Sequence, residues 1–198
     1  MTNKYYAYSL PEGKKGIVLS WEECSELVKG KKGARYKGFK IKSEAEEWLE
    51  KGADYSIKKK ALPGIYFDAG TGRGDGVEIS VTDENGKDLL FEVMHEKLVN
   101  IHGKHLLQKG KTNNYGELLS CLYAMEIARK KDKKNIFGDS KLVIDYWSNG
   151  YIKKKEIDPE TVSLATEVAA YRRRFEAEGG EIKRISGGDN PADLGFHR

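Results

Sequence analysis

Polar and apolar residues alternate over residues 4–10, and a turn at 11–15 separates them from a short apolar stretch at 16–19. This pattern predicts two strands joined as a hairpin. Two short helices are predicted near 21–28 and 44–50, because a serine precedes each and a glutamate follows that serine by three residues, as in a capping box. A third strand is predicted at 39–41, between the helices. Residues 1–51 are therefore predicted to form a small ββαβα domain.

The pattern changes after residue 62, where short apolar runs predict five strands and helical spacing predicts three long helices. The strands are expected at 64–67, 77–82, 89–93, 134–137 and 181–185, and the helices at 115–131, 141–148 and 160–178. The first three strands should be adjacent and antiparallel, because an Asn-Gly turn joins the second to the third. Residues 63–198 are thus predicted to form an α/β domain with a mixed five-stranded sheet flanked by helices, and the short basic stretch 52–62 to link the two domains.

Residues 94–111 follow neither pattern and are expected to form either an additional strand or a loop. They hold three of the four histidines, His95, His102 and His105. A zinc site needs four converging ligands, so these histidines alone do not predict one.

The amino-acid composition limits the kinds of partner and the cellular compartment that the chain can have. The 198 residues include 35 Lys+Arg and 31 Asp+Glu, and the net charge of +4 permits an anionic partner without requiring one. Cys24 and Cys121 lie far apart within helical patterns, which indicates a reducing compartment. No apolar run approaches the roughly 18 residues of a membrane span, and the N-terminal sequence lacks the apolar core of a signal peptide. We therefore expect a cytoplasmic protein with no membrane partner.

Four carboxylates stand at strand or helix ends of the second domain: Asp68, Glu117, Asp139 and Asp193. Ligands of α/β sheets bind beyond the carboxyl ends of the strands. Each acid alone has an ordinary explanation, such as a turn residue, a helix cap or a solvated surface group. If the four converge, they repel one another unless cations bind. Carboxylate oxygens are ligands that suit Mg²⁺ or Mn²⁺. Two such ions about 4 Å apart could activate a water molecule and stabilise the leaving oxygen of a phosphodiester.

The segments FDAGTG, TNNYGELLS, FGDSKLVI and NPADLGFHR together resemble the catalytic motifs of ribonuclease H1, in the ribonuclease H-like superfamily. The N-terminal pattern YYAYSLPEGKKGIVLSWEEC…GARYKGFKIKSEAEEWL resembles the hybrid-binding domain of the same family. The resemblance implies a ribonuclease H-like mixed five-stranded sheet preceded by a small α+β hybrid-binding domain. It also implies a monomeric endonuclease that uses two Mg²⁺ ions to hydrolyse the RNA strand of RNA–DNA hybrids, leaving 5′-phosphate and 3′-hydroxyl ends.

The resemblance also implies roles for the acids. Asp68 would bridge both metals, and Asp139 and Asp193 would help to hold them. Glu117 would serve one metal and the ribose 2′-hydroxyl of the RNA strand. Asp189 matches an acid that assists metal handling and product release in some members.

Six further residues match positions that contact the nucleic acid in this family: Asn113 and Asn114 in the catalytic domain, and Tyr6, Trp21, Tyr36 and Lys37 in the hybrid-binding domain. Aromatic faces stack on sugars or bases, and lysines bind phosphates. For the first two aromatic residues, a place in the core of a small domain is an equal alternative.

The chain departs from the family in several places. Gly74 and Gly38 stand where relatives carry an asparagine and a second lysine, and no histidine lies in 186–190. The loop 149–158 is too short for the basic protrusion of other members, so binding is expected to depend on the N-terminal domain. Two alternatives remain: a non-catalytic protein that binds RNA–DNA hybrids or double-stranded RNA, and another nuclease on the same fold.

Overall fold

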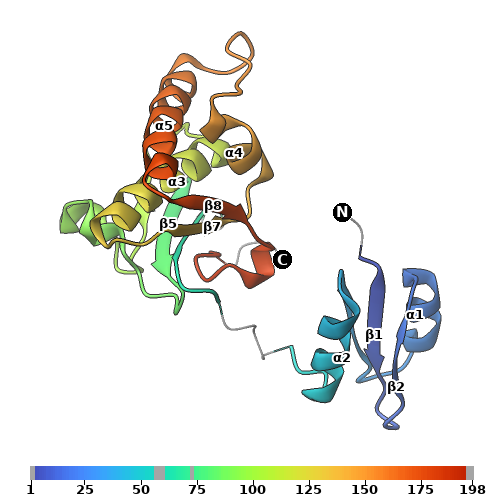
Figure 1. Cartoon of the computed structure of the whole chain (residues 1–198). Coiled ribbons are helices and arrows are strands. Elements are labelled where there is room, and N and C mark those ends of the chain that lie inside the picture. Colours follow the sequence, from blue (N-terminus) through green and yellow to red (C-terminus); the bar gives the residue numbers. More distant parts are fainter. Residues whose placement is uncertain (1–2, 56–60, 72–73, 195–198) are drawn as a thin grey trace. The chain divides into compact units, whose positions relative to one another are not determined.

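The computed structural model describes residues 3–55, 61–71 and 74–194 (Figure 1). The chain divides into two compact units, Met1–Lys59 and Lys60–Arg198. The border between them falls within the predicted linker. Residues 56–60 of that linker and the last four residues, 195–198, lie outside the described residues.

The N-terminal unit has the predicted ββαβα order. Its elements are β1 (Tyr5–Ser9), β2 (Lys15–Val18), α1 (Trp21–Val28), β3 (Arg35–Phe39) and α2 (Lys42–Glu50). The strands form an antiparallel sheet in the order β2-β1-β3, which leaves β3 at an edge. Ser20 caps α1 as predicted, since the Glu23 backbone N–H donates to its Oγ over 3.2 Å. The predicted cap at Ser43 is wrong, because α2 already begins at Lys42.

The small sheet has an apolar cluster on each face. Ala7 packs with Phe39 and Trp48 on one face, whereas its neighbour Tyr8 packs with Cys24 on the other. Successive strand residues point to opposite faces, so α2 covers the first face and α1 the second. Two helices on two faces give a unit of this size two small cores.

The second unit contains the predicted mixed five-stranded sheet. The strands are β4 (Ile65–Gly70), β5 (Glu78–Asp83), β6 (His105–Leu106), β7 (Asn135–Gly138) and β8 (Glu181–Arg184), in the order β6-β5-β4-β7-β8. β4 is antiparallel to β5 and parallel to β7, and β7 is parallel to β8. The predicted α/β class, with a mixed five-stranded sheet flanked by helices, is confirmed.

Helices cover the sheet and connect its parallel strands. They are α3 (Asn113–Lys130), α4 (Lys141–Asp145) and α5 (Pro159–Ala177), with 3₁₀ turns η1 (Leu90–Glu92), η2 (Glu96–Leu98), η3 (Trp147–Asn149) and η4 (Gly187–Asp189). α3 packs against β4 and β5, and α5 packs on α3 (Figure 1). The central strand β4 is buried along its whole length, so any polar residue within it lies inside the protein.

The strand predicted at 89–93 is wrong. After the turn, Asp88 forms a single bridge to Thr82, and the chain then enters η1. Leu89 and Leu90 are both buried in the main core. Neighbouring residues of a strand point to opposite faces, whereas a 3₁₀ turn lets both leucines reach the core. The third antiparallel strand is instead β6, within the segment 94–111, which the sequence left open between a strand and a loop.

Candidate active site and nucleic-acid surface

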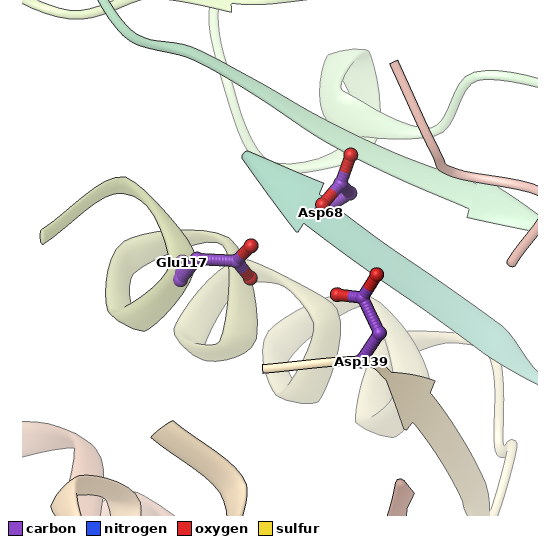
Figure 2. Close-up of side chains that lie close together, drawn as sticks. All are labelled: Asp68, Glu117 and Asp139. Atoms are coloured by element: carbon purple, nitrogen blue, oxygen red, sulfur yellow. The ribbon is translucent and has the colours of Figure 1, made fainter. Parts of the chain in front are cut away.

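Three of the four predicted acids converge in the second unit. Asp68 comes from β4, Glu117 from the first turns of α3, and Asp139 from the position after β7. One carboxylate oxygen of each lies within 4.8 Å of the others. Figure 2 shows the three side chains directed toward one another from these separate elements. We call these three residues the carboxylate cluster.

Gly116 lets α3 approach the sheet closely beside the cluster. A Cβ atom at this position would lie 2.5 Å from Val77 Cγ1 and 3.0 Å from Ala69 Cβ. Any side chain here would push α3 away from β4 and β5. Since Glu117 is the next residue, the glycine sets the distance between its carboxylate and Asp68.

Two further glycines place Asp139. A Cβ atom at Gly138, at the end of β7, would overlap the ring of Phe67 on β4. A Cβ atom at Gly187, in η4, would lie 2.6 Å from Asp139 Oδ2. The loop that contains Gly187 therefore comes within contact distance of the carboxylate, and a side chain there would displace Asp139 or the loop.

Burial dominates the electrostatics of the cluster. Asp68 is 1% exposed and Glu117 is 5% exposed. Burial, together with the negative charge of neighbouring acids, raises the pKa of Asp68 to about 6 and the pKa of Glu117 to about 10. The backbone N–H of Leu194 opposes the shift at Asp68, because it donates to Oδ2 over 2.9 Å. Without a cation, this pair of carboxyl groups is therefore harder to ionise than two separate carboxyl groups in water.

The cluster offers oxygen atoms that suit a divalent cation. Asp68 Oδ1 and Glu117 Oε2 are buried and accept no hydrogen bond from the described residues. Buried carboxylate oxygens without a donor are costly, and a divalent cation removes this cost. Three carboxylates at this spacing are the hard ligands that Mg²⁺ and Mn²⁺ prefer. The residues present thus fit such an ion.

Asp193 stands near the cluster but is not one of its three members. Its negative charge contributes to the raised pKa of Asp68. Asp189, the other acid predicted in this region, is exposed in η4 and does not join the cluster. The structure therefore brings Asp193 close to the site and leaves Asp189 at its periphery.

Asn190 fixes the C-terminal segment to the central strand, and the sequence did not reveal this role. Its buried side chain donates from Nδ2 to the Phe67 carbonyl over 2.9 Å and accepts from the Ala192 N–H over 3.0 Å. Phe67 directly precedes Asp68, so Asn190 holds the segment carrying Asp193 against the strand that carries the cluster. The Asn-Pro pair indicates only a turn.

Asn113 and Asn114 form the start of α3. Thr112 caps this helix, because the Tyr115 N–H donates to its Oγ1 over 3.2 Å. Asn113 lies four residues before Glu117, so the two side chains share one side of the helix. Its Oδ1 is buried and has no partner among the described residues, whereas Asn114 is exposed. Beside this helix start lies a hollow of about 260 Å³, lined in part by Lys109 and Lys111.

The three aromatic residues predicted in the N-terminal unit form one continuous surface. The ring centroid of Trp21 lies 5.9 Å from that of Tyr6 and 5.3 Å from that of Tyr36. Trp21 and Tyr36 are each 42% exposed, so Trp21 is not a core residue. We call these three residues the aromatic surface. Their arrangement leaves ring faces and edges open for stacking.

Lys37 does not join the aromatic surface directly. It follows Tyr36 on β3 and so points to the opposite face of the sheet, with its Nζ 5.6 Å from the ring centroid of Phe39. At Gly38, where relatives often carry a second lysine, a Cβ atom would overlap the side chain of Asn3. The glycine is therefore matched to its surroundings in this chain.

The histidines of segment 94–111 take local roles. His95 Nδ1 accepts from the Lys97 N–H over 3.2 Å, and His105 Nδ1 lies 2.8 Å from the Leu98 carbonyl oxygen. Within the described ranges, none of the three histidines belongs to a group of potential metal ligands.

Comparison with known proteins bears on both units. Residues 4–49 match the family model of the ribonuclease H1 N-terminal domain, as the sequence predicted. Among solved structures, the N-terminal RNase H domain of Rv2228c from Mycobacterium tuberculosis, studied as a fusion with maltose-binding protein, is 19% identical. The match covers 63% of this chain and 82% of that chain, with a TM-score of 0.36. No helix in the described part of the chain is long and apolar enough to cross a bilayer.

Proposed function

We propose that this chain is a ribonuclease H1 that hydrolyses the RNA strand of RNA–DNA hybrids and leaves 5′-phosphate and 3′-hydroxyl ends. The observation that carries the proposal is the convergence of Asp68, Glu117 and Asp139 on a sheet of ribonuclease H topology. The ribonuclease H1 N-terminal domain at residues 4–49 supplies the link to hybrids. The cluster alone would fit other metal-dependent nucleases, and the N-terminal domain alone would fit a binding protein.

In this proposal the carboxylate cluster holds Mg²⁺, with Mn²⁺ as the alternative ion. Asp68 lies at its centre, and Asp193 supports it from the C-terminal segment. When bound, the ions supply an activated water and stabilise the oxygen that leaves the phosphodiester. The chain itself holds the acids at fixed separation through Gly116, Gly138 and Gly187. It also keeps the acids away from bulk water, so their charges interact more strongly than they would in water.

Selection of the RNA strand follows from hydroxyl recognition. The side of α3 that carries Asn113 and Glu117 offers acceptor oxygens to a ribose 2′-hydroxyl. A DNA strand lacks this donor, so the buried oxygens would stay without a partner. A-form duplexes present their 2′-hydroxyls in a wide and shallow minor groove. Recognition of the 2′-hydroxyl would direct cleavage to the RNA strand of a hybrid and would leave duplex DNA intact.

The N-terminal unit contributes affinity in this scheme. Its aromatic surface stacks on bases or sugars, and each such contact contributes about 1–3 kcal/mol. Lys37 and the other basic residues of β3 and its preceding loop bind phosphates, so affinity falls as salt rises. A monomer that acts in the cytoplasm remains our expectation.

A strand-labelled substrate tests the proposal. The full chain is incubated with Mg²⁺ or Mn²⁺ and with hybrids labelled on either strand, next to double-stranded RNA and double-stranded DNA. We expect cleavage of the RNA strand of the hybrid alone, and none when EDTA is added. The 5′ ends should be open to a phosphatase and the 3′ ends to a poly(A) polymerase. Binding of hybrid without cleavage would identify a non-catalytic binding protein, and cleavage of duplex DNA would identify a different nuclease.

A further inference from the structure

We infer that Tyr55 is a positioning residue of the aromatic surface, whose hydroxyl fixes the backbone of the edge strand β3 at Tyr36. The inference rests on the proposed function, because it takes the aromatic surface to bind the hybrid. The segment that matches the ribonuclease H1 N-terminal domain ends at residue 49, so Tyr55 lies beyond it.

The hydroxyl of Tyr55 makes two hydrogen bonds to one residue. It accepts from the Tyr36 backbone N–H over 2.7 Å and donates to the Tyr36 carbonyl over 2.8 Å. β3 is an edge strand in the order β2-β1-β3, so its outward N–H and C=O groups otherwise face water. A hydroxyl is both donor and acceptor, and it pairs with both groups as a neighbouring strand would.

Tyr55 is itself held in place from the core of the unit. Its ring centroid lies 5.5 Å from that of Trp48, which is buried. Two residues earlier, Ala53 is buried and its N–H donates to the Trp48 carbonyl over 2.9 Å. The Arg35 side chain donates to the Ala53 carbonyl over 3.3 Å. Ala53 has a φ of 53°, a left-handed conformation that alanine seldom adopts, so tertiary contacts impose this bend.

These contacts give Tyr36 a support on each side. On the inner side β3 pairs with β1, where Tyr8 lies opposite Tyr36. On the outer side the Tyr55 hydroxyl makes hydrogen bonds with both the N–H and the carbonyl of Tyr36. The Tyr36 ring meanwhile contacts Trp21, the centre of the aromatic surface. Preorganised side chains bind more tightly because less freedom is lost on binding, so loosening this edge should weaken binding without affecting the carboxylate cluster.

The test is Tyr55→Phe in the full chain. This substitution removes the hydroxyl and keeps the ring on Trp48. Binding to a fluorescently labelled hybrid is measured by anisotropy in EDTA, and steady-state cleavage is measured in Mg²⁺. We expect a Kd and a KM about fivefold higher with kcat unchanged, which corresponds to the loss of about one hydrogen bond. Tyr151→Phe, at a tyrosine that is 72% exposed in the second unit, is the matched control and should leave all three values unchanged.

Amide hydrogen exchange separates positioning from mere stability. The Tyr36 N–H should exchange faster in Tyr55→Phe, while amides between β1 and β2 keep their protection. In the wild-type chain, the Tyr36 N–H should exchange more slowly than amides that face solvent. This comparison can be made even if the variant folds poorly. If the wild-type chain binds hybrid and Tyr55→Phe binds it with the same Kd, the inference about Tyr55 is wrong and the proposed function stands. Failure of the wild-type chain to bind hybrid would overturn the inference and the proposed function together.

Discussion

The two units of the chain present their sites in opposite ways. The N-terminal unit exposes Trp21 and Tyr36 on a small sheet, whereas the second unit buries Asp68 and Glu117 in a larger one. Exposed rings add little cost to folding, while buried carboxylates destabilise the fold until a cation joins them. The first arrangement suits binding and the second suits charge-dependent chemistry. The two sites should therefore fail separately when each is altered.

The largest expected effect breaks cleavage while sparing binding. Asp139→Asn keeps the shape of the side chain but removes one charge from the carboxylate cluster. We expect cleavage of the hybrid to fall on the order of 1000-fold, because bound metal supplies most of the rate. The Kd for hybrid in EDTA should stay within about twofold of the wild-type value, since the aromatic surface is intact. Gel-based cleavage and anisotropy measure the two quantities, and substantial remaining activity would contradict the role of the cluster.

A substitution in the N-terminal unit should have the opposite effect, weakening binding while cleavage chemistry is unchanged. Trp21→Ala removes the centre of the aromatic surface and should weaken hybrid binding about tenfold or more. The kcat at saturating hybrid should not change, because the second unit is untouched. Leu19→Ala, at an exposed apolar residue next to α1, is the control for a general loss of surface. Equal effects of the two substitutions would mean that the stacking surface is not the binding site.

Metal binding should reveal the cost of the buried carboxylates. Burial raises the pKa of Asp68 to about 6 and of Glu117 to about 10 in the metal-free protein. A carboxyl group with a raised pKa in the folded state contributes stability at low pH, and this stability is lost as the pH rises through the raised value. The metal-free second unit should thus lose stability between about pH 4 and pH 10 through these two groups.

Mg²⁺ should restore that stability most strongly where the acids are ionised. At a concentration 100 times the Kd, a bound ion stabilises by about 2.7 kcal/mol. Scanning calorimetry should therefore show a larger rise in Tm on adding Mg²⁺ at pH 8 than at pH 5.5. The rise should shrink in Asp139→Asn, which loses one ligand of the cluster. A rise that is independent of pH would argue that Mg²⁺ binds elsewhere.

Local patterns predicted most of the fold. The ββαβα order, the strands β4, β5, β7 and β8 and the long helices α3 and α5 follow from alternation, helical spacing and turn residues, whereas the helix predicted at 141–148 is divided into α4 and η3. The strand predicted at 89–93 is wrong because this short, mostly apolar stretch fits a strand and a 3₁₀ turn equally. Only the core decides that both Leu89 and Leu90 are buried. The cap predicted at Ser43 is also wrong, because the helix begins at Lys42 with Ile41 as its N-cap.

The chemistry of the site was easier to predict than its supports. Acidic residues at strand and helix ends are visible in the sequence, and three of the four converge. Asn190 was missed because it bonds to the Phe67 carbonyl across 123 positions of sequence. The contact between Gly187 and Asp139 is equally nonlocal. Tyr55 escaped notice because a tyrosine in a short basic stretch gives no sign that its hydroxyl pairs with a strand edge.

The smallest expected effect probes one of these hidden supports. Gly187→Ala would bring a methyl group to 2.6 Å from Asp139 Oδ2, so the carboxylate or the loop must shift by a few tenths of an ångström. We expect Mg²⁺ affinity, measured by calorimetric titration, to fall about three- to fivefold. Gly188→Ala is the matched control, because a Cβ atom there meets nothing within 4 Å. An equal loss in both variants would trace the effect to the flexibility of the loop rather than to its contact with Asp139, and the cluster would then not depend on Gly187.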